Sequence, residues 1–381
     1  MNWDYKVLDE LGTVSRGRSR HRPRNDKSLF GGKYPFVQTA DVKAANLYLT
    51  DYTETYNEKG LEQSKLWKAG TLCITIAANI ADTAILGIDA CFPDSVMGFV
   101  PFDGVSNVKF IKYAFDLLQR DFKQISQGTA QDNLSWQKLE TIKFPAPDIE
   151  VQNKIVEILG SYDDLIENNR KQIKLLEEAA QRLYKEWFVD LRFPGYEDCK
   201  IIDGVPEGWK KVSLTQIAPI VTGKKDANFG TENGKYLFFT CAQEPIKAPS
   251  YSFDCDAVIL AGNGDFNVKL YRGQFEAYQR TYVFSPYESQ NLYLLYYTVK
   301  DNMRQLFQGA SGSTIKFLTK RMLEEIIVYI PEEGTLDCFS NVCEAYQRKI
   351  EVLKDQMNNA QKARERLLPQ LMSGQVEVSI G

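Results

Sequence analysis

The chain has 381 residues, of which 44% are hydrophobic and 25% are charged, and it carries a net charge of −4. A length well above that of one ordinary domain predicts two or three folded units. The mildly acidic balance excludes binding to nucleic acid or to an anionic membrane through net charge. Any such binding must therefore come from local basic patches.

The N-terminal segment, MNWDYKVLDELG, and the cysteines indicate a protein of a reducing compartment. This segment is charged from its fourth residue and lacks an apolar signal region. The seven cysteines are scattered and never spaced as CxxC, and only one histidine is present. These facts argue against a disulfide framework and against a zinc site. We expect buried thiols, a cytoplasmic location and no metal.

Residues 15–26, SRGRSRHRPRND, concentrate positive charge near the start of the chain. The segment contains five arginines and the chain's only histidine, His21. A charge run of this kind is either a solvated loop or a phosphate contact. Because arginine neighbours disfavour a protonated imidazole, we expect no general-base role for His21.

Residues 72–92, LCITIAANIADTAILGIDACF, are the one stretch that resembles a membrane span. Asn79, Asp82 and Asp89 interrupt it, and its apolar runs are short. A spanning helix needs about 20 predominantly apolar residues. Strands joined by turns are the better prediction.

The chain repeats itself. Residues 128–148 align without a gap with residues 312–332, so that Leu139 matches Leu323 and Pro147 matches Pro331. Residues 3–17 resemble residues 209–223, and KYPF at 33–36 resembles KYLF at 235–238. These matches indicate a tandem duplication, with longer connecting loops in the first copy.

Each copy has the pattern of a mixed α/β unit. Short β-rich runs such as TLCITIAA and DAVILAG are separated by Gly, Asn and Pro. Helices are expected at residues 110–125 and 292–307. The segments KLETIKFPAP and MLEEIIVYIP predict a short helix that leads into a strand ending at proline.

A long helix is expected after each copy, the first over about residues 151–191. Apolar residues at heptad spacing predict a coiled-coil seam on both helices. The seam residues are Ile166, Ile173, Leu176, Leu183 and Trp187 in the first helix, and Ile350, Leu353, Met357, Leu367 and Leu371 in the second. Arg364 interrupts the second seam, and Pro369 predicts an earlier end of that helix. The alternative is that each helix packs only on its own unit.

Known catalytic motifs are missing. The sequence contains no phosphate-binding GxxxxGK[ST], no GxGxxG, no HExxH and no GxSxG. We therefore expect a binding protein without catalytic residues.

Polar loops recur at matching places in the two copies. The arginine run corresponds to TGKKDANFGTENGKY at residues 222–236, and SQGTAQDN at 126–133 corresponds to QGASGSTIK at 308–316. Arg and Lys hold phosphates, whereas Arg, Gln and Asn also read base edges. The candidates for nucleic-acid contact are Arg16, Arg18, Arg20, His21, Arg22, Arg24, Lys33, Tyr34, Gln38, Thr39, Thr129, Gln131, Asn133, Lys224, Lys225, Asn228, Lys235, Tyr236, Asn263, Ser311, Ser313, Thr314 and Lys316.

These features together resemble the specificity subunit of type I restriction-modification systems. The strongest local matches are LYKEWFVDLRFPGYE at 183–197, VPEGWKKVSL at 205–214, and GRSRHRPRND followed by GGKYPFVQTADV. The resemblance implies an α/β (α+β) fold with two target recognition domains, at 1–148 and 197–332. Long conserved helices at 149–196 and 333–381 would pair as an antiparallel coiled coil with pseudo-twofold symmetry.

The resemblance also implies the partners. Each recognition domain would read one half of a split site in double-stranded DNA, and the helices would set the spacer and dock two methyltransferase subunits. Restriction subunits would join this core. S-adenosylmethionine, ATP and magnesium would be held by the partner subunits, and no cofactor by this chain.

Two other readings stay open at this point. One is a coiled-coil scaffold that binds only proteins. The other is a metal-dependent enzyme acting on nucleic acid, with scattered acidic residues as ligands.

Overall fold

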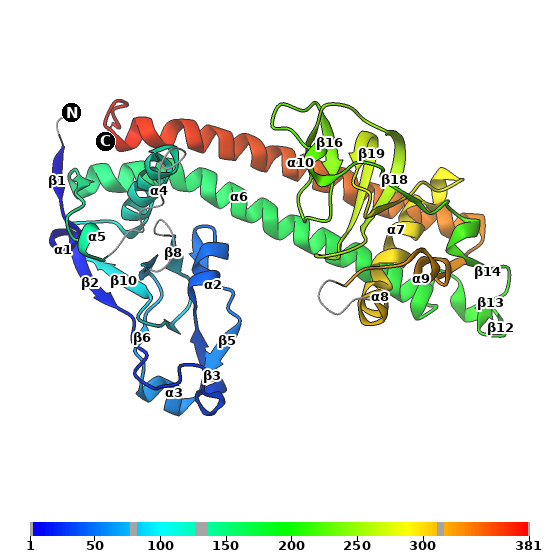
Figure 1. Ribbon diagram of the computed structural model, residues 1–381, viewed down its shortest axis with the longest axis horizontal. Coiled ribbons are helices and arrows are strands. Elements are labelled where there is room, and N and C mark those ends of the chain that lie inside the picture. Colours follow the sequence, from blue (N-terminus) through cyan, green and yellow to red (C-terminus); the bar gives the residue numbers. More distant parts are fainter. Residues whose placement is uncertain (1–2, 77–81, 126–135, 311–315, 380–381) are drawn as a thin grey trace. The chain divides into compact units, whose positions relative to one another are not determined.

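The computed structural model describes residues 3–76, 82–125, 136–310 and 316–379. Within it the chain forms two compact units. Unit 1 comprises Met1–Arg170 and Asp355–Gly381, and unit 2 comprises Lys171–Lys354. Both long helices therefore contribute to both units (Figure 1).

Unit 1 contains three small sheets. The first strand, β1 (Asp4–Lys6), pairs antiparallel with the last, β11 (Phe144–Ala146). A five-stranded sheet has the order β2 (Gly12–Arg16), β10 (Val96–Pro101), β7 (Leu72–Thr75), β8 (Thr83–Leu86) and β4 (Tyr48–Leu49). A four-stranded sheet has the order β5 (Glu54–Tyr56), β3 (Phe30–Phe36), β9 (Ala90–Cys91) and β6 (Leu66–Trp67).

The helices of unit 1 are short, apart from α4 and the two long ones. They are α1 (Leu8–Leu11), α2 (Thr39–Ala44), α3 (Glu58–Glu62), α4 (Val108–Ile125), α5 (Trp136–Leu139), the start of α6 (Ile149–Tyr184) and the end of α10 (Glu333–Met372), with a 3₁₀ turn η1 (Lys27–Leu29). The main core joins β7 and β10 to α4, α6 and α10. Phe110, Phe115 and Phe144 are fully buried in it, and each contributes about 1.5–3 kcal/mol through burial.

Unit 2 is built on a six-stranded sheet. Its order is β15 (Val221–Thr222), β20 (Thr281–Phe284), β18 (Phe253–Ala261), β19 (Val268–Ala277), β16 (Tyr236–Phe239) and β17 (Ile246–Ala248). The first strand of the repeat, β14 (Lys210–Ser213), pairs with the last, β21 (Ile327–Ile330). A hairpin of β12 (Ile201–Ile202) and β13 (Val205–Pro206) precedes them.

The helices of unit 2 pack against this sheet and against one another. They are η2 (Lys185–Val189), a π-helix that continues α6, α7 (Leu292–Asp301), α8 (Met303–Gly309) and α9 (Lys320–Glu324), with 3₁₀ turns η3 (Tyr196–Asp198), η4 (Leu214–Gln216), η5 (Ala227–Phe229) and η6 (Ser289–Asn291). The helix expected at 292–307 is thus present but divides at Asn302.

The structure confirms the duplication. The offset between α4 and α7 at their first residues, Val108 and Leu292, equals that between α6 and α10, which begin at Ile149 and Glu333. The β1–β11 pairing of unit 1 recurs as β14–β21, and β2–β10 recurs as β15–β20.

Two matched glycines allow a close approach of backbone segments. A Cβ atom on Gly17 would lie 2.3 Å from the carbonyl oxygen of Pro93, and one on Gly223 would lie 2.0 Å from that of Ala277. Both glycines directly follow the matched strands β2 and β15. The repeat therefore has a glycine where a second backbone segment leaves no space for a side chain.

The long helices contact each other inside each unit, and in unit 1 the contacts show opposite chain directions. In unit 1, Asn169 donates to Gln356 at 3.3 Å, whereas Asp163 pairs with Arg364. In unit 2, Trp187 and Phe188 pack on Phe339. Every predicted seam residue is buried or half-buried. These contacts are consistent with an antiparallel coiled coil, whose continuity along both helices stays a prediction.

The expected early end of the second helix is wrong. Helix α10 continues through Pro369 to Met372. A proline cannot donate to the carbonyl four residues earlier, which here belongs to Glu365. Arg120 of α4 donates its Nη1 to that oxygen at 3.2 Å, so the backbone acceptor freed by the proline is satisfied.

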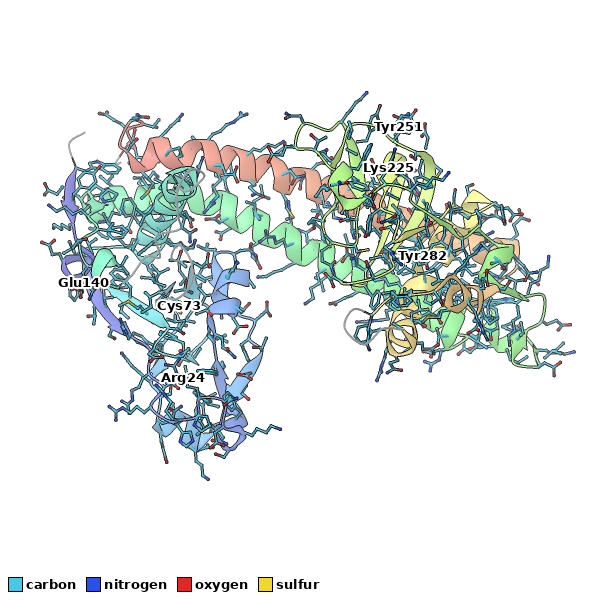
Figure 2. All side chains as sticks on the ribbon, viewed as in Figure 1. Arg24, Cys73, Glu140, Lys225, Tyr251 and Tyr282 are labelled. Carbon is cyan, nitrogen blue, oxygen red and sulfur yellow. The ribbon has the colours of Figure 1, made fainter. Side chains whose placement is uncertain are left out.

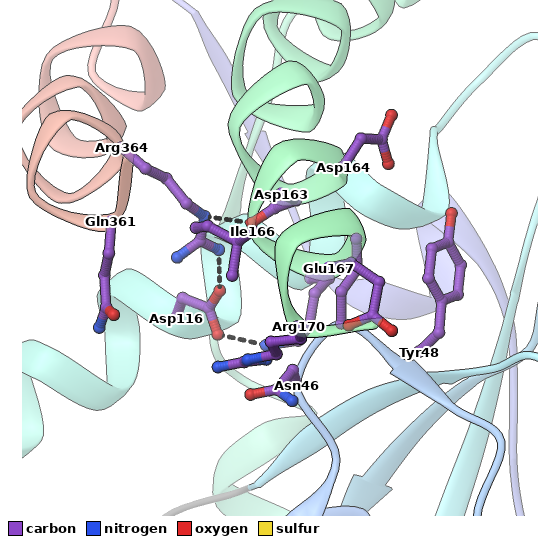
Figure 3. A pocket seen from close by; sticks show the side chains of 12 residues that line it. Asn46, Tyr48, Asp116, Asp163, Asp164, Ile166, Glu167, Arg170, Gln361 and Arg364 are labelled. Atoms are coloured by element: carbon purple, nitrogen blue, oxygen red, sulfur yellow. Dashed lines mark hydrogen bonds and ion pairs between the residues drawn. The ribbon is translucent and has the colours of Figure 1, made fainter. Parts of the chain in front are cut away.

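Arg364, which interrupts the seam, belongs to a charged cluster in unit 1 (Figure 3). Its guanidinium lies 2.7 Å from Asp163 of α6 and 3.1 Å from Asp116 of α4. Tyr113 donates to Asp163 at 2.5 Å, and Lys112 pairs with Asp116. Burial raises the pKa of Asp163, and Arg364 opposes that effect. An open pocket of about 260 Å³ adjoins the cluster.

Unit 2 holds α10 to its sheet through a second charged cluster. Arg272 of β19 grips Glu344 of α10 with two hydrogen bonds, of 2.7 and 3.1 Å. Tyr293 and Arg348 donate to the same carboxylate at 2.9 and 2.7 Å. The hydrogen bonds from Arg272, Arg348 and Tyr293 lower the pKa of Glu344 to about 2.

All seven cysteines are free thiols. Cys73, Cys91 and Cys343 are buried, as expected, and Figure 2 marks Cys73 within unit 1. Cys338 is exposed and the other three are half-buried, so the expectation of buried thiols is correct only in part. Residues 72–75 and 83–86 are strands. Among the described residues, no helix is long and apolar enough to cross a membrane.

The glycine contact yields a stability prediction. We expect Gly223→Ala to lower the free energy of unfolding by about 2 kcal/mol or more, because the new methyl group overlaps backbone atoms that have no room to move. Gly334→Ala, which meets nothing within 4 Å in the first turn of α10, is the matched control. Urea denaturation should show a lower free energy of unfolding for Gly223→Ala and no decrease for Gly334→Ala.

The Glu344 cluster yields a pH prediction. A carboxylate whose pKa is about 2 when folded and near 4.5 when unfolded stabilises the folded state above about pH 4.5, and this contribution is lost as the pH falls toward 2. We therefore expect the free-energy difference between the wild type and Glu344→Gln to be largest near neutral pH and to shrink below pH 4.5.

The control for this experiment is Glu325→Gln, which removes an exposed pair with Arg321 and should change stability little at any pH. Denaturation curves across this range provide the measurement. A difference for Glu344→Gln that stayed constant with pH would contradict the assignment.

Candidate nucleic-acid interface

The arginine-rich loop connects β2 to η1 and is held by its own polar contacts. Gly17 and Arg18 donate backbone N–H groups to the carbonyls of Val96 and Phe92, at 2.8 and 3.1 Å. Gln63 accepts from the backbone N–H groups of Arg20 and His21, at 2.7 and 3.0 Å. The loop therefore has a defined shape although it contains little regular structure.

His21 has a structural partner in this loop. Its Nε2 lies 2.8 Å from Asp26 Oδ2. The backbone N–H of Ser28 and the His21 ring together lower the pKa of the Asp26 carboxyl. His21 thus braces the end of the loop, and no catalytic partner of His21 is found in the described part of the chain.

The five arginines divide into two groups. Three of them have internal partners. Arg22 donates to the backbone carbonyls of Ser19 and His21, and Arg24 pairs with the Asp94 carboxylate at 2.8 Å. Arg18 donates to the backbone carbonyl of Glu62 at 3.4 Å. Arg16 and Arg20 are exposed, and within the described residues their guanidinium groups have no partner. These two cations are free to meet a phosphate.

An open pocket of about 560 Å³ lies beside the loop. Figure 2 shows Arg24 at the end of unit 1 that is remote from α6. Phe36 stacks on Tyr56, with ring centroids 4.1 Å apart, and gives this end of the unit a rigid base. The pocket is lined by Ser19, Arg24, Asn25, Lys27, Phe30, Phe36, Gln38, Glu54, Pro93 and Ser95.

Three further candidates of unit 1 lie close to this pocket in sequence. Lys33 and Tyr34 belong to β3, where Lys33 pairs with Glu58 in an exposed contact of 3.5 Å. Thr39 is the first residue of α2. An exposed ion pair of this kind adds little stability, so Lys33 can exchange its partner.

In unit 2, four loops converge in the same way. Gly223 donates to Thr281 at 3.1 Å, and Gln279 donates to the carbonyl of Lys225 at 2.9 Å. The backbone N–H of Gly262 donates to the carbonyl of Arg280 at 2.8 Å, and the side-chain amide of Asn267 donates to the carbonyl of Cys241 at 3.1 Å. We call these segments, residues 222–226, 240–243, 262–267 and 278–281, the unit 2 loop cluster.

The cluster brings together several predicted residues. Asn263 bridges to Phe317, next to Lys316. Lys225, labelled in Figure 2, lies 4.4 Å from the centre of the Phe229 ring, and the neighbouring Lys224 is exposed. Lys316 lies over the ring of Phe307 at 4.2 Å.

Lys316 adjoins the loop cluster through Phe317, and three other predicted residues of unit 2 lie outside it. Asn228 is exposed in η5. Lys235 lies 5.4 Å from the ring of Tyr236, which in turn packs on Tyr251 at 4.8 Å.

Sequence reasoning missed several polar residues in these loops. Glu54 binds the amide of Gln38, and Asp265 binds that of Gln243, at 2.8 and 2.6 Å. Lys269 donates to the carbonyl of Ala242 at 2.8 Å, and burial lowers the pKa of its ammonium group. The available signal was the position of Glu54 opposite the run KYPF and of Gln243 just after the run KYLF, and no local pattern marks Asp265 or Lys269.

Six candidates lie outside the described residues: Thr129, Gln131, Asn133, Ser311, Ser313 and Thr314. Within the described residues, no group of three or more His, Cys, Asp or Glu side chains could hold a metal ion.

Comparisons with known proteins give one consistent result. The model of the type I restriction modification DNA specificity domain matches residues 1–178 and 206–354. The type I restriction enzyme MjaIX specificity subunit of Methanocaldococcus jannaschii is 24% identical over 411 residues, covering 99% of this chain and 94% of that protein. The EcoDI specificity subunit of Escherichia coli is 36% identical over 168 residues, covering 44% of this chain and 36% of that protein.

A solved structure agrees in fold. The S subunit of a type I restriction-modification system from M. genitalium superposes with a TM-score of 0.59 at 16% identity, covering 100% of this chain and 97% of that one. The family match covers most of the chain and falls on its two repeats. The chain therefore belongs to the family of type I restriction modification DNA specificity domains, with two target recognition domains.

Proposed function

We propose that this chain is the non-catalytic subunit that directs a type I restriction-modification complex to its DNA target. Each repeat reads one half of a bipartite site in duplex DNA. The observation that carries the proposal is the duplication itself: two copies of the family's domain present converging loops with exposed cations, Arg16 and Arg20 in one and Lys224 in the other. A pseudo-twofold chain suits two identical partners on a duplex.

The long helices have the second role. Helices α6 and α10 set the spacer between the half-sites and dock two methyltransferase subunits, through which restriction subunits join. The division into recognition domains at 1–148 and 197–332, with helical regions at 149–196 and 333–381, is part of this proposal, as is a cytoplasmic location. S-adenosylmethionine, ATP and magnesium would be held by the partners.

The loop cations predict how affinity depends on salt. In the complex with methyltransferase subunits, Arg20→Ala should weaken binding about equally for target and unrelated DNA. It should also reduce the slope of log affinity against log salt by about 1, because one phosphate contact is lost. Arg16→Ala should behave alike.

Lys210→Ala serves as the control, since it removes the same charge from an exposed position on β14, which belongs to neither the interface loops nor the long helices. Equilibrium binding at several salt concentrations provides the measurement, after assembly of each complex has been verified. Unchanged affinity and slope for both arginine variants would exclude this loop from the DNA contact.

The function itself predicts a methylation pattern. Deleting the gene for this chain should abolish adenine methylation at one bipartite motif in the host genome, and restoring the gene should restore it. Single-molecule sequencing of native DNA provides the measurement. A methylation pattern that did not change would exclude the proposed role.

A further inference from the structure

Both units fix a glutamine amide with a carboxylate after the same strand of the repeat. Gln38 follows β3, which contains KYPF, and Gln243 follows β16, which begins at the tyrosine of KYLF. Gln38 Nε2 donates to Glu54 Oε2 at 2.8 Å, and Gln243 Nε2 donates to Asp265 Oδ2 at 2.6 Å. The sequences of the two loops differ, yet both present the same pair of groups.

The backbone holds Gln38 in place in unit 1. Its N–H donates to Asp41 Oδ2 at 2.7 Å, and its carbonyl accepts from Val42 at 3.1 Å. Glu54 lies directly opposite Phe36 in the β3–β5 pairing. The amide and its carboxylate therefore both start from rigid positions on the wall of the open pocket beside the arginine-rich loop.

Cross-links between loops hold Gln243 in unit 2. Lys269 donates to the carbonyl of Ala242 at 2.8 Å. Asn267 donates its amide to the carbonyl of Cys241 at 3.1 Å and to that of Asp265 at 2.6 Å. The segment carrying Gln243 is thus tied to the hairpin that carries its carboxylate, inside the unit 2 loop cluster.

The carboxylate decides which way each amide points. A carboxylate accepts hydrogen bonds and repels a carbonyl oxygen, so Nε2 must face it. One N–H and the oxygen Oε1 of each amide remain, and neither has a partner within the described part of the chain. Each loop therefore offers one donor and one acceptor in a fixed order.

We propose that Gln38 and Gln243 each read an adenine in the major groove, one in each half-site. This inference rests on the proposed function. Oε1 accepts from adenine N6, and the remaining N–H donates to adenine N7. Guanine presents the acceptor O6 where adenine has its N6 donor, so O6 would face Oε1. A turned-over amide could donate to O6 but would bring Oε1 against N7, and the carboxylate prevents even this turn, so guanine is rejected.

The assignment is tested with the complex of this chain and methyltransferase subunits, by selection from a random DNA library and then by binding to single-substitution duplexes. Replacing the cognate adenine by guanine should weaken wild-type binding roughly 10- to 100-fold. Gln38→Ala should abolish this discrimination at one position of one half-site, and Gln243→Ala at one position of the other. Affinity for unrelated DNA should not change.

Variants of the two carboxylates distinguish base recognition by the glutamine amides from a purely structural role of these glutamines. Glu54→Gln and Asp265→Asn keep a hydrogen-bond partner but let the amide turn over and donate to guanine O6. Discrimination against guanine should therefore fall while binding persists. Gln274→Ala is the matched control: Gln274, half-buried like Gln38, also donates its amide to a carboxylate, Asp254 at 3.0 Å, and it lies outside the loop cluster. Its removal should leave every position unchanged.

Three results would count against these assignments. A wild-type complex without sequence preference would overturn the proposed function. A wild-type complex that selects a bipartite target, together with Gln38→Ala and Gln243→Ala variants that keep every preference, would overturn the base-reading assignment alone. Loss of discrimination in the same half-site for both variants would also overturn it.

Discussion

The pairing of the first strand of each repeat with the last is the constraint on which the rest of the structure depends. β1 pairs with β11, and β14 pairs with β21. A long helix begins three residues after each of these last strands. The strand pairing thus fixes where α6 and α10 start, and those helices build the core of each unit with α4 or α7.

Partly buried charge adds a second constraint to the helices. Arg364 meets Asp163 and Asp116 in unit 1, and Arg272 meets Glu344 in unit 2. Such pairs add little net stability compared with apolar packing, but a member that loses its partner while still shielded from water destabilises the fold. A slipped helix would separate the partners, so the charges penalise every register but one. Asn169, a buried polar residue on the seam, also favours one register, because a slipped helix would remove its hydrogen bond to Gln356.

The sequence predicts most of the framework, because the framework follows from local patterns and from the repeat. Hydrophobic periodicity and the alignment of the two repeats predict the positions of α4, α6, α7 and α10 and of the strands within 72–92. The end of α10 does not, since the oxygen freed by Pro369 is satisfied by Arg120, far away in the chain. Whether a disallowed residue is tolerated depends on such tertiary partners.

The candidate interface was predictable in place but not in detail. Composition identifies the arginine-rich loop. Only the folded structure shows that Arg22 and Arg24 have internal partners, whereas Arg16 and Arg20 have none within the described residues. The carboxylates that orient Gln38 and Gln243 come from other strands and loops. No local pattern shows such pairings, because they form only when the sheet brings the segments together.

The glycine at the end of β2 or β15 has an evolutionary consequence. Gly17 and Gly223 each mark a point where the backbone admits no side chain, and the chain beyond them carries the interface loop. The two loops already differ in length and in the choice of Arg or Lys. Mutation can therefore recode or lengthen each loop while the strand before it keeps its place, so a lineage can acquire a new target on an inherited scaffold.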